Sequence, residues 1–211
     1  MTVLDTDRDE ITVASDRLSR FIVDLARHTE RDIGFGFVLT PDAPNTYPAL
    51  LAAFEHSWTS GEPLPISNEN SDAVVYTDPF ANVALRFWHD VNHVRRRLSF
   101  DLIDELELSL WHLGELEKAG HPPNSLVWRM LHADLAGQAY VQAFAKRFPD
   151  DQRRFVRGCV TAGFDRGLLD ELRSGARTQP NSSEATPHRT YCLCVKCLRG
   201  TATIKSPGRS R

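Results

Sequence analysis

The stretch ANVALRFWHDVNHVRRRL, residues 81–98, decides what kind of fold this chain adopts. Its apolar residues recur at every third or fourth position, which is the period of an α-helix. Together they form one stripe, made of Val83, Phe87, Val91, Val94 and Leu98. Leu85 lies on a second side and Trp88 lies between the two. A helix that is apolar on more than one side is often buried in the middle of a bundle, which argues against an exposed face on this segment.

The polar residues of the same segment leave two interpretations open. His89 and His93 are four residues apart, nearly opposite the centre of the stripe, and Asp90 lies at its edge. Taken alone, this position favours a surface that faces water. The spacing also puts both imidazoles on one face of the helix, where they could bind one metal ion.

Working outward, the chain is mainly helical. Periodic patterns predict further helices over residues 7–31, 47–58, 100–119, 125–148 and 152–173. Residues 33–40 and the segment AVVYT, residues 73–77, are candidates for a short β element. The polar segment 59–80 is long for a plain connection. We therefore predict a mainly α fold, a single helical-bundle domain over residues 1–175 with a short β element.

Composition and charge set the class of protein. The chain has 211 residues, 41% of them hydrophobic, which fits one globular domain with a tail. No apolar run approaches the roughly 18 residues that span a bilayer. The N-terminal residues are acidic and polar, unlike a signal peptide, so we expect a cytoplasmic protein.

The C-terminal residues 176–211 form a separate compositional region. They hold seven Lys or Arg and one acidic residue, so residues 1–175 carry a charge of -9 against the -3 of the whole chain. We expect a disordered basic tail that could contact an anionic partner. His188, Cys192, Cys194 and Cys197 in this tail are candidate zinc ligands. The C-x-C step is tighter than the common C-x₂-C step and no second such pair follows, so a thiol-bearing tail without zinc is the competing interpretation.

Asp134 carries the strongest signal for a buried polar site. It falls in the middle of an apolar face formed by Leu126, Val127, Met130, Gly137, Val141 and Phe144, and Gln138 follows one turn later. Burying an unpaired carboxylate is costly, so we expect Asp134 to have a specific partner such as a metal ion, a His or an Arg.

The segment DELELSLWHLGELE, residues 104–117, contributes further acids. Its predicted stripe is Leu102, Ile103, Leu106, Leu110, Leu113 and Leu116. Glu105 and His112 lie on one flank of this stripe and Glu107 on the other. Either Glu could be a metal ligand or a general base, and the sequence does not choose between them.

His56, His89-Asp90 and Asp134 follow one another like the H…HD…D pattern of the HD-domain phosphohydrolases, and WHDVNH resembles the HD-x-x-H form of its central motif. The resemblance covers residues 47–148. It implies an all-helical bundle in which His56, His89, Asp90 and Asp134 bind one or two divalent metal ions. The chain also resembles uncharacterised phage or prophage proteins with a W-H-D-x-x-H motif, here with Phe100, Glu107, Asp134, Gly137, Gln138 and Tyr140 after it.

If this site forms, its imidazole and carboxylate ligands suit Mn²⁺, Fe²⁺, Co²⁺, Ni²⁺ or Zn²⁺. The bound ion would lower the pKa of a water molecule and polarise a phosphoryl oxygen. His93 or Glu107 could then transfer a proton, and Arg86, Arg95, Arg96 or Arg97 could pair with phosphate. The expected function is a metal-dependent phosphohydrolase that acts on a nucleotide or related phosphoester.

Two other classes stay open. A ferritin-like helical bundle would also use His and carboxylate ligands, but the chain lacks the paired E-x-x-H motifs of that arrangement. A non-enzymatic accessory protein of the phage or plasmid type would bind a macromolecular partner and hold no stoichiometric metal. The sequence does not specify the substrate, the metal or the oligomeric state.

Overall fold

The computed structural model of the chain describes residues 3–69 and 74–178. It confirms a mainly helical fold with one small sheet. The helices are α1 (Val3–Ile33), α2 (Tyr47–Ser60), α3 (Pro79–Arg96), α4 (Leu102–Lys118), α5 (Leu126–His132), η1 (Ala133–Gly137), α6 (Gln138–Ala145), α7 (Gln152–Ala162) and α8 (Phe164–Thr178). The strands are β1 (Phe37–Thr40) and β2 (Leu64–Ser67). The tail candidates His188, Cys192, Cys194 and Cys197 lie outside the described residues.

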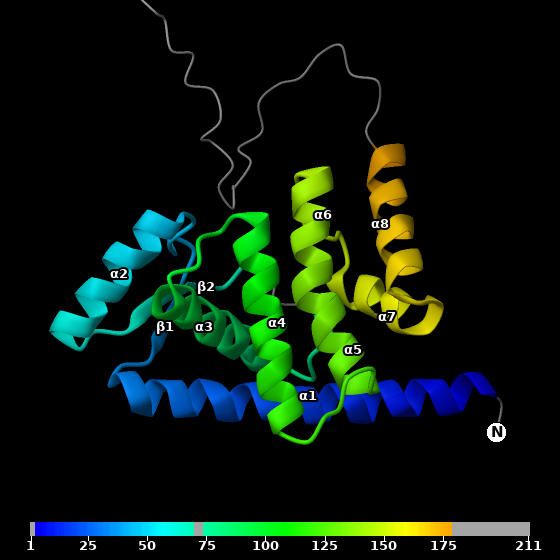
Figure 1. Ribbon diagram of the computed structural model, residues 1–211, viewed down its shortest axis with the longest axis horizontal. Coiled ribbons are helices and arrows are strands. Elements are labelled where there is room, and N and C mark those ends of the chain that lie inside the picture. The colour runs from blue at the N-terminus through cyan, green and yellow to red at the C-terminus, as the bar shows by residue number, and fades with distance from the viewer. Residues whose placement is uncertain (1–2, 70–73, 179–211) are drawn as a thin grey trace, which may run out of the picture.

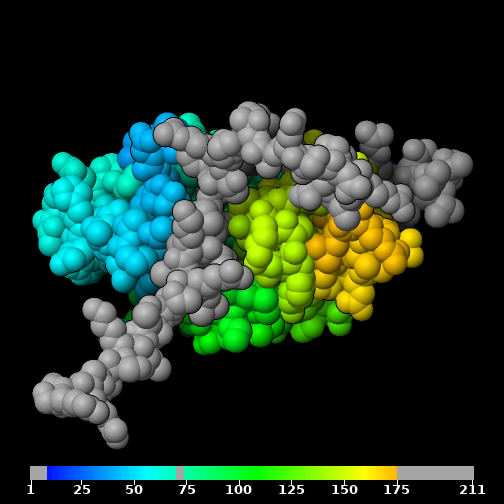
Figure 2. All heavy atoms as spheres, turned by 90° about the horizontal axis from the view of Figure 1, so that it is seen from above, coloured from blue at the N-terminus to red at the C-terminus, as the bar shows by residue number. Residues whose placement is uncertain are grey.

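The long helix α1 runs along one side of the molecule, all other helices lie to one side of it, and α3 and α5 pack on it (Figure 1). Helix α3 packs on α1 and against α2, β2 and α4. Helix α4 also packs on α5 and α6, and α7 and α8 pack on the opposite side of these helices. Seen from above, the α2 region and the α7–α8 pair form opposite ends of the body (Figure 2).

The small sheet is parallel and joins β1 to β2, with Phe37 opposite Leu64. Helix α2 makes the crossover between the two strands. Leu64 and Ile66 point into the core and are fully buried. Strand β1 agrees with the prediction for residues 33–40. The prediction of a strand at residues 73–77 is wrong for residues 74–77, which have no strand structure although Val74, Val75 and Tyr76 are buried, and residue 73 lies outside the described residues.

Local capping explains where the central helix begins and ends. The Asp78 carboxylate accepts a hydrogen bond of 2.8 Å from the N–H of Ala81, and Pro79 occupies the first turn. At the other end Arg97 adopts a left-handed conformation with φ 59°. The N–H of Leu98 then returns to the carbonyl of His93, at 3.0 Å. This turn brings the Leu98 carbonyl back over the last turn of α3.

The predicted helix over residues 125–148 is present but irregular. It begins at the Ser125 cap and contains one π-helical stretch, η1, between α5 and α6. The single helix predicted over residues 152–173 is wrong. Gly163, with φ 96°, breaks it into α7 and α8, because a positive φ is strained for residues with a side chain.

The core is one continuous cluster, and α3 lies at its centre. The α3 residues that are buried occupy every side of the helix: Ala81, Asn82, Val83, Ala84, Leu85, Phe87, Trp88, Val91, Asn92 and His93. Trp88 contacts Phe21 of α1 and Trp111 of α4. Helix α3 is therefore a central helix, in agreement with the argument from its second apolar side. In the described part of the chain, no helix combines the length and the apolar character needed to cross a membrane.

Candidate metal centre

Two imidazoles and one carboxylate converge between α3 and α4. The Nε2 atoms of His89 and His93 are 2.8 Å apart. Oε2 of Glu105 lies 3.3 Å from Nε2 of His89, and Oε1 lies 3.5 Å from Nε2 of His93. Among the described residues, these three form the one group whose His, Cys or carboxylate ligand atoms converge closely enough to hold a metal ion.

These separations are close to those between ligands of one ion. Bonds of about 2.1 Å place adjacent ligand atoms about 3.0 Å apart in octahedral geometry and about 3.4 Å apart in tetrahedral geometry. The two nitrogen atoms are 2.8 Å apart, and each has its own nearest Glu105 oxygen, Oε2 at 3.3 Å for His89 and Oε1 at 3.5 Å for His93. One oxygen of Glu105 and the two nitrogen atoms all lie within 4.8 Å of one another, so the group could hold one divalent ion.

Backbone geometry determines which nitrogen of His93 is available. Its Nδ1 lies 3.0 Å from the carbonyl oxygen of Leu98, which can only accept a hydrogen bond. Nδ1 therefore carries the proton, and in the neutral ring Nε2 presents its lone pair to the cluster. A metal-binding His commonly donates its second N–H in this way, which holds the ring in place.

His89 also has a partner for its second nitrogen. Its Nδ1 lies 3.1 Å from Nε2 of His112, which comes from α4. His112 is fully buried and its ring packs against Trp88, with ring centroids 3.9 Å apart. Each imidazole of α3 thus has a partner at its Nδ1. That partner is the Leu98 carbonyl for His93 and Nε2 of His112 for His89.

Burial and mutual contact shift the pKa values of this group. Burial alone would raise the pKa of Glu105, but hydrogen bonds and attraction from His89 and His93 outweigh it and lower that pKa to about 2. Burial lowers the pKa of His89, and Glu105 more than compensates, so that its pKa is raised overall. Burial, followed by repulsion from His89 and His93, keeps the pKa of His112 well below its usual value. Glu105 is therefore ionised at neutral pH and His112 is neutral.

Two charged residues of α3 extend the centre along the helix. Asp90 is half-buried, and burial raises its pKa in spite of attraction from His89 and His93. Arg86, one turn earlier, donates a hydrogen bond of 2.9 Å to the carbonyl of Ser67 and interacts electrostatically with Asp90. These two residues place a carboxylate and a guanidinium beside the His–His–Glu group.

A second buried polar cluster surrounds Asp134. This carboxylate is fully buried in η1 and accepts hydrogen bonds from the hydroxyl of Tyr76 and from the side-chain amides of Gln138 and Gln152. Burial raises the pKa of Asp134, and the hydrogen bond from Tyr76 opposes that shift. The prediction that Asp134 is buried with specific partners is confirmed, and the partners are a tyrosine and two glutamines.

The structure brings together some of the residues expected from the sequence and separates others. Asp134 interacts electrostatically with His89 but is bonded to its own three donors, outside the converging group. His56 is 64% exposed and pairs with Glu62 at 2.8 Å. Glu107 is exposed on α4. The H…HD…D residues therefore do not meet at one point, and His56 and Glu107 take no part in the cluster.

The interpretation of His89 and His93 as a surface facing water is wrong. His93 is fully buried and the His89 side chain is 17% exposed, because α4 covers the side of α3 opposite its main stripe. The buried face of α4 also differs from the predicted stripe. Leu108, Ser109, His112, Leu113 and Leu116 are buried, whereas Ile103 and Leu110 are exposed.

Because the buried face of α4 is turned relative to the predicted stripe, Glu105 rather than Glu107 reaches the site. Glu105 and His112 are seven residues apart, so they share one side of α4. The sequence placed both on one flank of the stripe, and that shared flank was the available signal. Leucine on several sides of the helix hid which flank faces the core.

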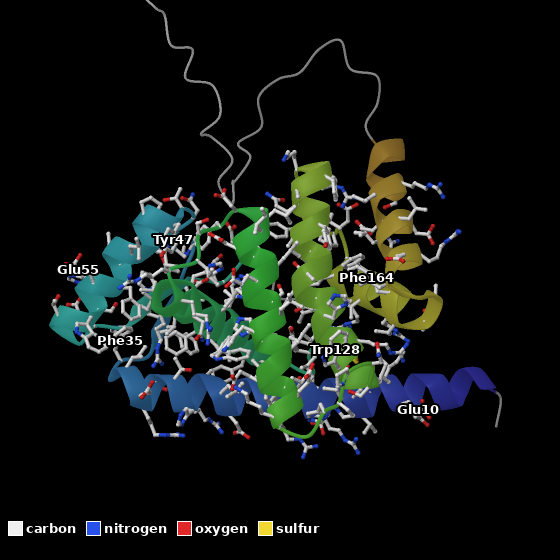
Figure 3. All side chains as sticks on the ribbon, viewed as in Figure 1. Glu10, Phe35, Tyr47, Glu55, Trp128 and Phe164 are labelled. Carbon is white, nitrogen blue, oxygen red and sulfur yellow. The ribbon has the colours of Figure 1, made fainter. Side chains whose placement is uncertain are left out.

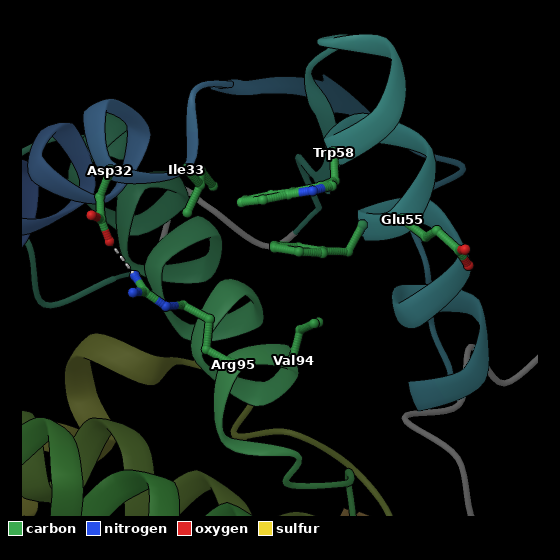
Figure 4. Close-up of a pocket in the computed structure, with 7 residues that line it drawn as sticks. Asp32, Ile33, Glu55, Trp58, Val94 and Arg95 are labelled. Atoms are coloured by element: carbon green, nitrogen blue, oxygen red, sulfur yellow. Dashed lines mark hydrogen bonds and ion pairs between the residues drawn. The ribbon is translucent and has the colours of Figure 1, made fainter.

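A surface hollow of about 470 Å³ lies away from this centre, between the end of α1, α2 and the last turn of α3 (Figure 4). Phe54 and Trp58 form its aromatic wall with nearly parallel rings. Arg95 and Asp32 pair across its other side at 2.6 Å. Among the described residues, the group of convergent ligand atoms at His89, His93 and Glu105 does not line this hollow.

Comparison with known proteins gives no relative for this chain: no family model matches it, and neither a curated protein nor a solved structure does. The geometry of the centre is therefore the basis for any functional assignment.

Proposed function

We propose that the chain is a mononuclear metal-dependent hydrolase, with His89, His93 and Glu105 as the ligands of one divalent transition-metal ion. The convergence of these three ligand atoms carries the proposal. Catalytic zinc sites typically use three protein ligands and leave a position for water or substrate, whereas structural sites use four. The partial exposure of His89 and Glu105, 17% and 19%, leaves a route for solvent to that position.

Asp90 is the residue best placed to move a proton. It lies in the same helical turn as His89 and His93, is half-buried, and has its pKa raised by burial. A carboxylate with a raised pKa can accept a proton from a metal-bound water, whose own pKa the ion lowers toward neutrality. His93 acts as a ligand in this scheme, and exposed Glu107 has no role.

A phosphoester is the substrate class that this arrangement fits. The metal ion would polarise one phosphoryl oxygen. Arg86 has one hydrogen bond within the described residues, to Ser67, and a guanidinium carries five N–H donors. The remaining donors could bind phosphate oxygens beside Asp90. A nucleotide or another small phosphorylated molecule is therefore the expected substrate.

The metal content of purified protein tests this proposal, after reconstitution with Mn²⁺, Fe²⁺, Co²⁺, Ni²⁺ or Zn²⁺. We expect about one equivalent in the wild type and in Glu107→Gln, and at least a tenfold weaker affinity in Glu105→Gln. Both variants change one acid of α4 to its amide, but only Glu105 faces the cluster. Absence of metal from the wild type, or equal binding by both variants, would contradict the proposal.

The reaction class is tested with p-nitrophenyl phosphate and bis(p-nitrophenyl) phosphate on the metal-loaded protein. Asp90→Asn should keep the metal and lower kcat by about 10²–10⁴-fold, since a positioned general base contributes about that much. Full activity in Asp90→Asn would remove Asp90 from the mechanism, and phosphate release that is independent of metal would overturn the assignment.

The donor set also favours a second function. Two imidazoles and one carboxylate with open positions are typical of non-haem Fe²⁺ centres that react with oxygen. In that case the Fe²⁺-loaded protein would consume O₂ as its Fe²⁺ is oxidised to Fe³⁺, and Glu105→Gln would abolish this consumption. Metal-dependent phosphate release without O₂ consumption would leave the hydrolase as the function.

A further inference from the structure

We propose that His112 is a positioning residue of the metal centre, which orients His89 and selects the tautomer whose Nε2 faces the ion. This inference rests on the proposed metal centre and adds a residue that binds neither metal nor substrate. It concerns the contact between Nδ1 of His89 and Nε2 of His112, at 3.1 Å.

The direction of this hydrogen bond follows from metal binding. A neutral imidazole carries one proton, so His89 can bind a metal through Nε2 only if its proton is on Nδ1. That N–H then donates to His112, and Nε2 of His112 must be the acceptor. His112 thus provides for His89 what the carbonyl of Leu98 provides for His93 at 3.0 Å.

The other ring nitrogen of His112 has no partner. With Nε2 as an acceptor, the proton of neutral His112 is on Nδ1. Nδ1 of His112 is buried and has no hydrogen-bond partner among the described residues. A buried polar atom without a partner is destabilising and rare in proteins. The missing hydrogen bond at Nδ1 is a cost of holding His112 with its Nε2 toward His89. Such a cost is consistent with a functional role for His112.

Packing prevents His112 from turning to relieve the unpartnered nitrogen. Its ring packs against both indoles of Trp88 and Trp111, with centroids 3.9 and 5.1 Å away, and the two indoles contact each other with centroids 5.7 Å apart. The guanidinium of Arg96 covers the outer face of Trp111, 3.7 Å from the ring centroid. The ring is therefore held with Nε2 directed at His89 before any metal arrives, so that the second ligand is preorganised.

The test compares His112→Gln with His112→Asn, which carry the same amide on side chains that differ in length by one methylene group. The oxygen of Gln can reach the position of Nε2 and accept from His89, whereas the oxygen of Asn reaches only the position of Nδ1. Co²⁺ is titrated into both variants and the wild type, and affinity and the visible absorption spectrum are recorded. Thermal melting shows that each variant is folded.

We expect His112→Gln to keep the wild-type spectrum and an affinity within about threefold. His112→Asn should bind Co²⁺ about 10–100-fold more weakly, the usual loss for a partner of a metal ligand. Equal affinity in wild type and His112→Asn would overturn the inference. A changed spectrum in His112→Gln would also overturn the inference, since it would make His112 itself a ligand. The His112→Gln measurement tests the inference even if His112→Asn fails to fold.

Failure of the proposed function gives a different result. If wild-type protein binds no Co²⁺, the metal centre and the role of His112 fall together. If wild-type protein binds Co²⁺ and both His112 variants match it in affinity and spectrum, the metal centre stands and only the role of His112 is rejected.

Discussion

The hydrogen bonds of single buried residues in this protein come largely from partners far away in the sequence. Asp134 is the clearest case, because its acceptors are satisfied by Tyr76 before α3 and by Gln152 at the start of α7, together with Gln138 in the next turn. One buried carboxylate thus ties three segments together. The cost of burying it is offset only while all of its donors are in place.

Asp134→Ala should therefore lower the free energy of unfolding by about 2–4 kcal/mol, because three buried donors lose their acceptor. Urea unfolding followed by circular dichroism measures this change. Glu10→Ala is the control, since Glu10 is exposed on α1 and points away from the body (Figure 3), and should change stability by less than about 0.5 kcal/mol. A loss below about 1 kcal/mol for Asp134→Ala would show that the donors find water instead.

At the scale of elements, the π-helical stretch η1 lies inside an otherwise regular helix. It holds Asp134, and such stretches often occur at functional sites. Gly137, its last residue, packs closely on Phe155 of α7, since a Cβ there would lie 2.8 Å from the phenyl ring. The irregular turn and the close approach of α7 together give Asp134 its surroundings.

The packing of α7 on α8 depends on Gly167. A Cβ at this position would lie 2.6 Å from the backbone of Cys159, a separation that the backbone could relieve only by moving. Gly167→Ala should lower the free energy of unfolding by about 1–3 kcal/mol through this overlap.

Gly158→Ala is the matched control, because a Cβ there meets open space within α7. It should leave stability unchanged or raise it by up to about 1 kcal/mol, since Ala favours a helix over Gly. Thermal unfolding of both variants checks the pair. A stable Gly167→Ala protein would mean that α7 and α8 can separate without cost.

For the whole molecule, stability and metal binding are linked through protons. Glu105 has a pKa of about 2 against an ordinary 4.5, so its contribution to stability is present above pH 4.5 and lost as the pH falls toward 2. His89 has a raised pKa, so its contribution is complete below its ordinary pKa of 6.5 and is lost as the pH rises through the folded value. Metal ions compete with the proton for His89.

We therefore expect the stabilisation by metal to grow with pH. Metal-free protein should lose stability as the pH rises above about 6.5, whereas saturating metal at 100 times Kd should add about 2.7 kcal/mol at a pH where His89 is neutral. Unfolding with Zn²⁺ or with a chelator, between pH 5.5 and 8.5, measures the difference. Glu105→Gln, which binds the metal at least tenfold more weakly, should show at most about half of this difference at the same metal concentration. A metal effect that is constant across this range would contradict proton competition at His89.

Sequence alone determined the helices, most of their ends and the burial of Asp134. These features depend on local physics: apolar periodicity, the Asp78 cap, the proline in a first turn, and the cost of a carboxylate on an apolar face. The four-residue spacing of His89 and His93 is equally local, since any α-helix puts such residues on one face. The break at Gly163 was missed because a Gly is compatible with either a helix or a turn.

Only the tertiary structure decided which faces meet. Periodicity identifies the most apolar side of a helix, but it does not show what covers the other sides. Helix α4 covers the second side of α3, so His89 and His93 are enclosed, and the rotation of α4 selects Glu105 over Glu107. The residues of the candidate metal centre lie on the polar sides of α3 and α4. These sides are buried only because the two helices pack against each other.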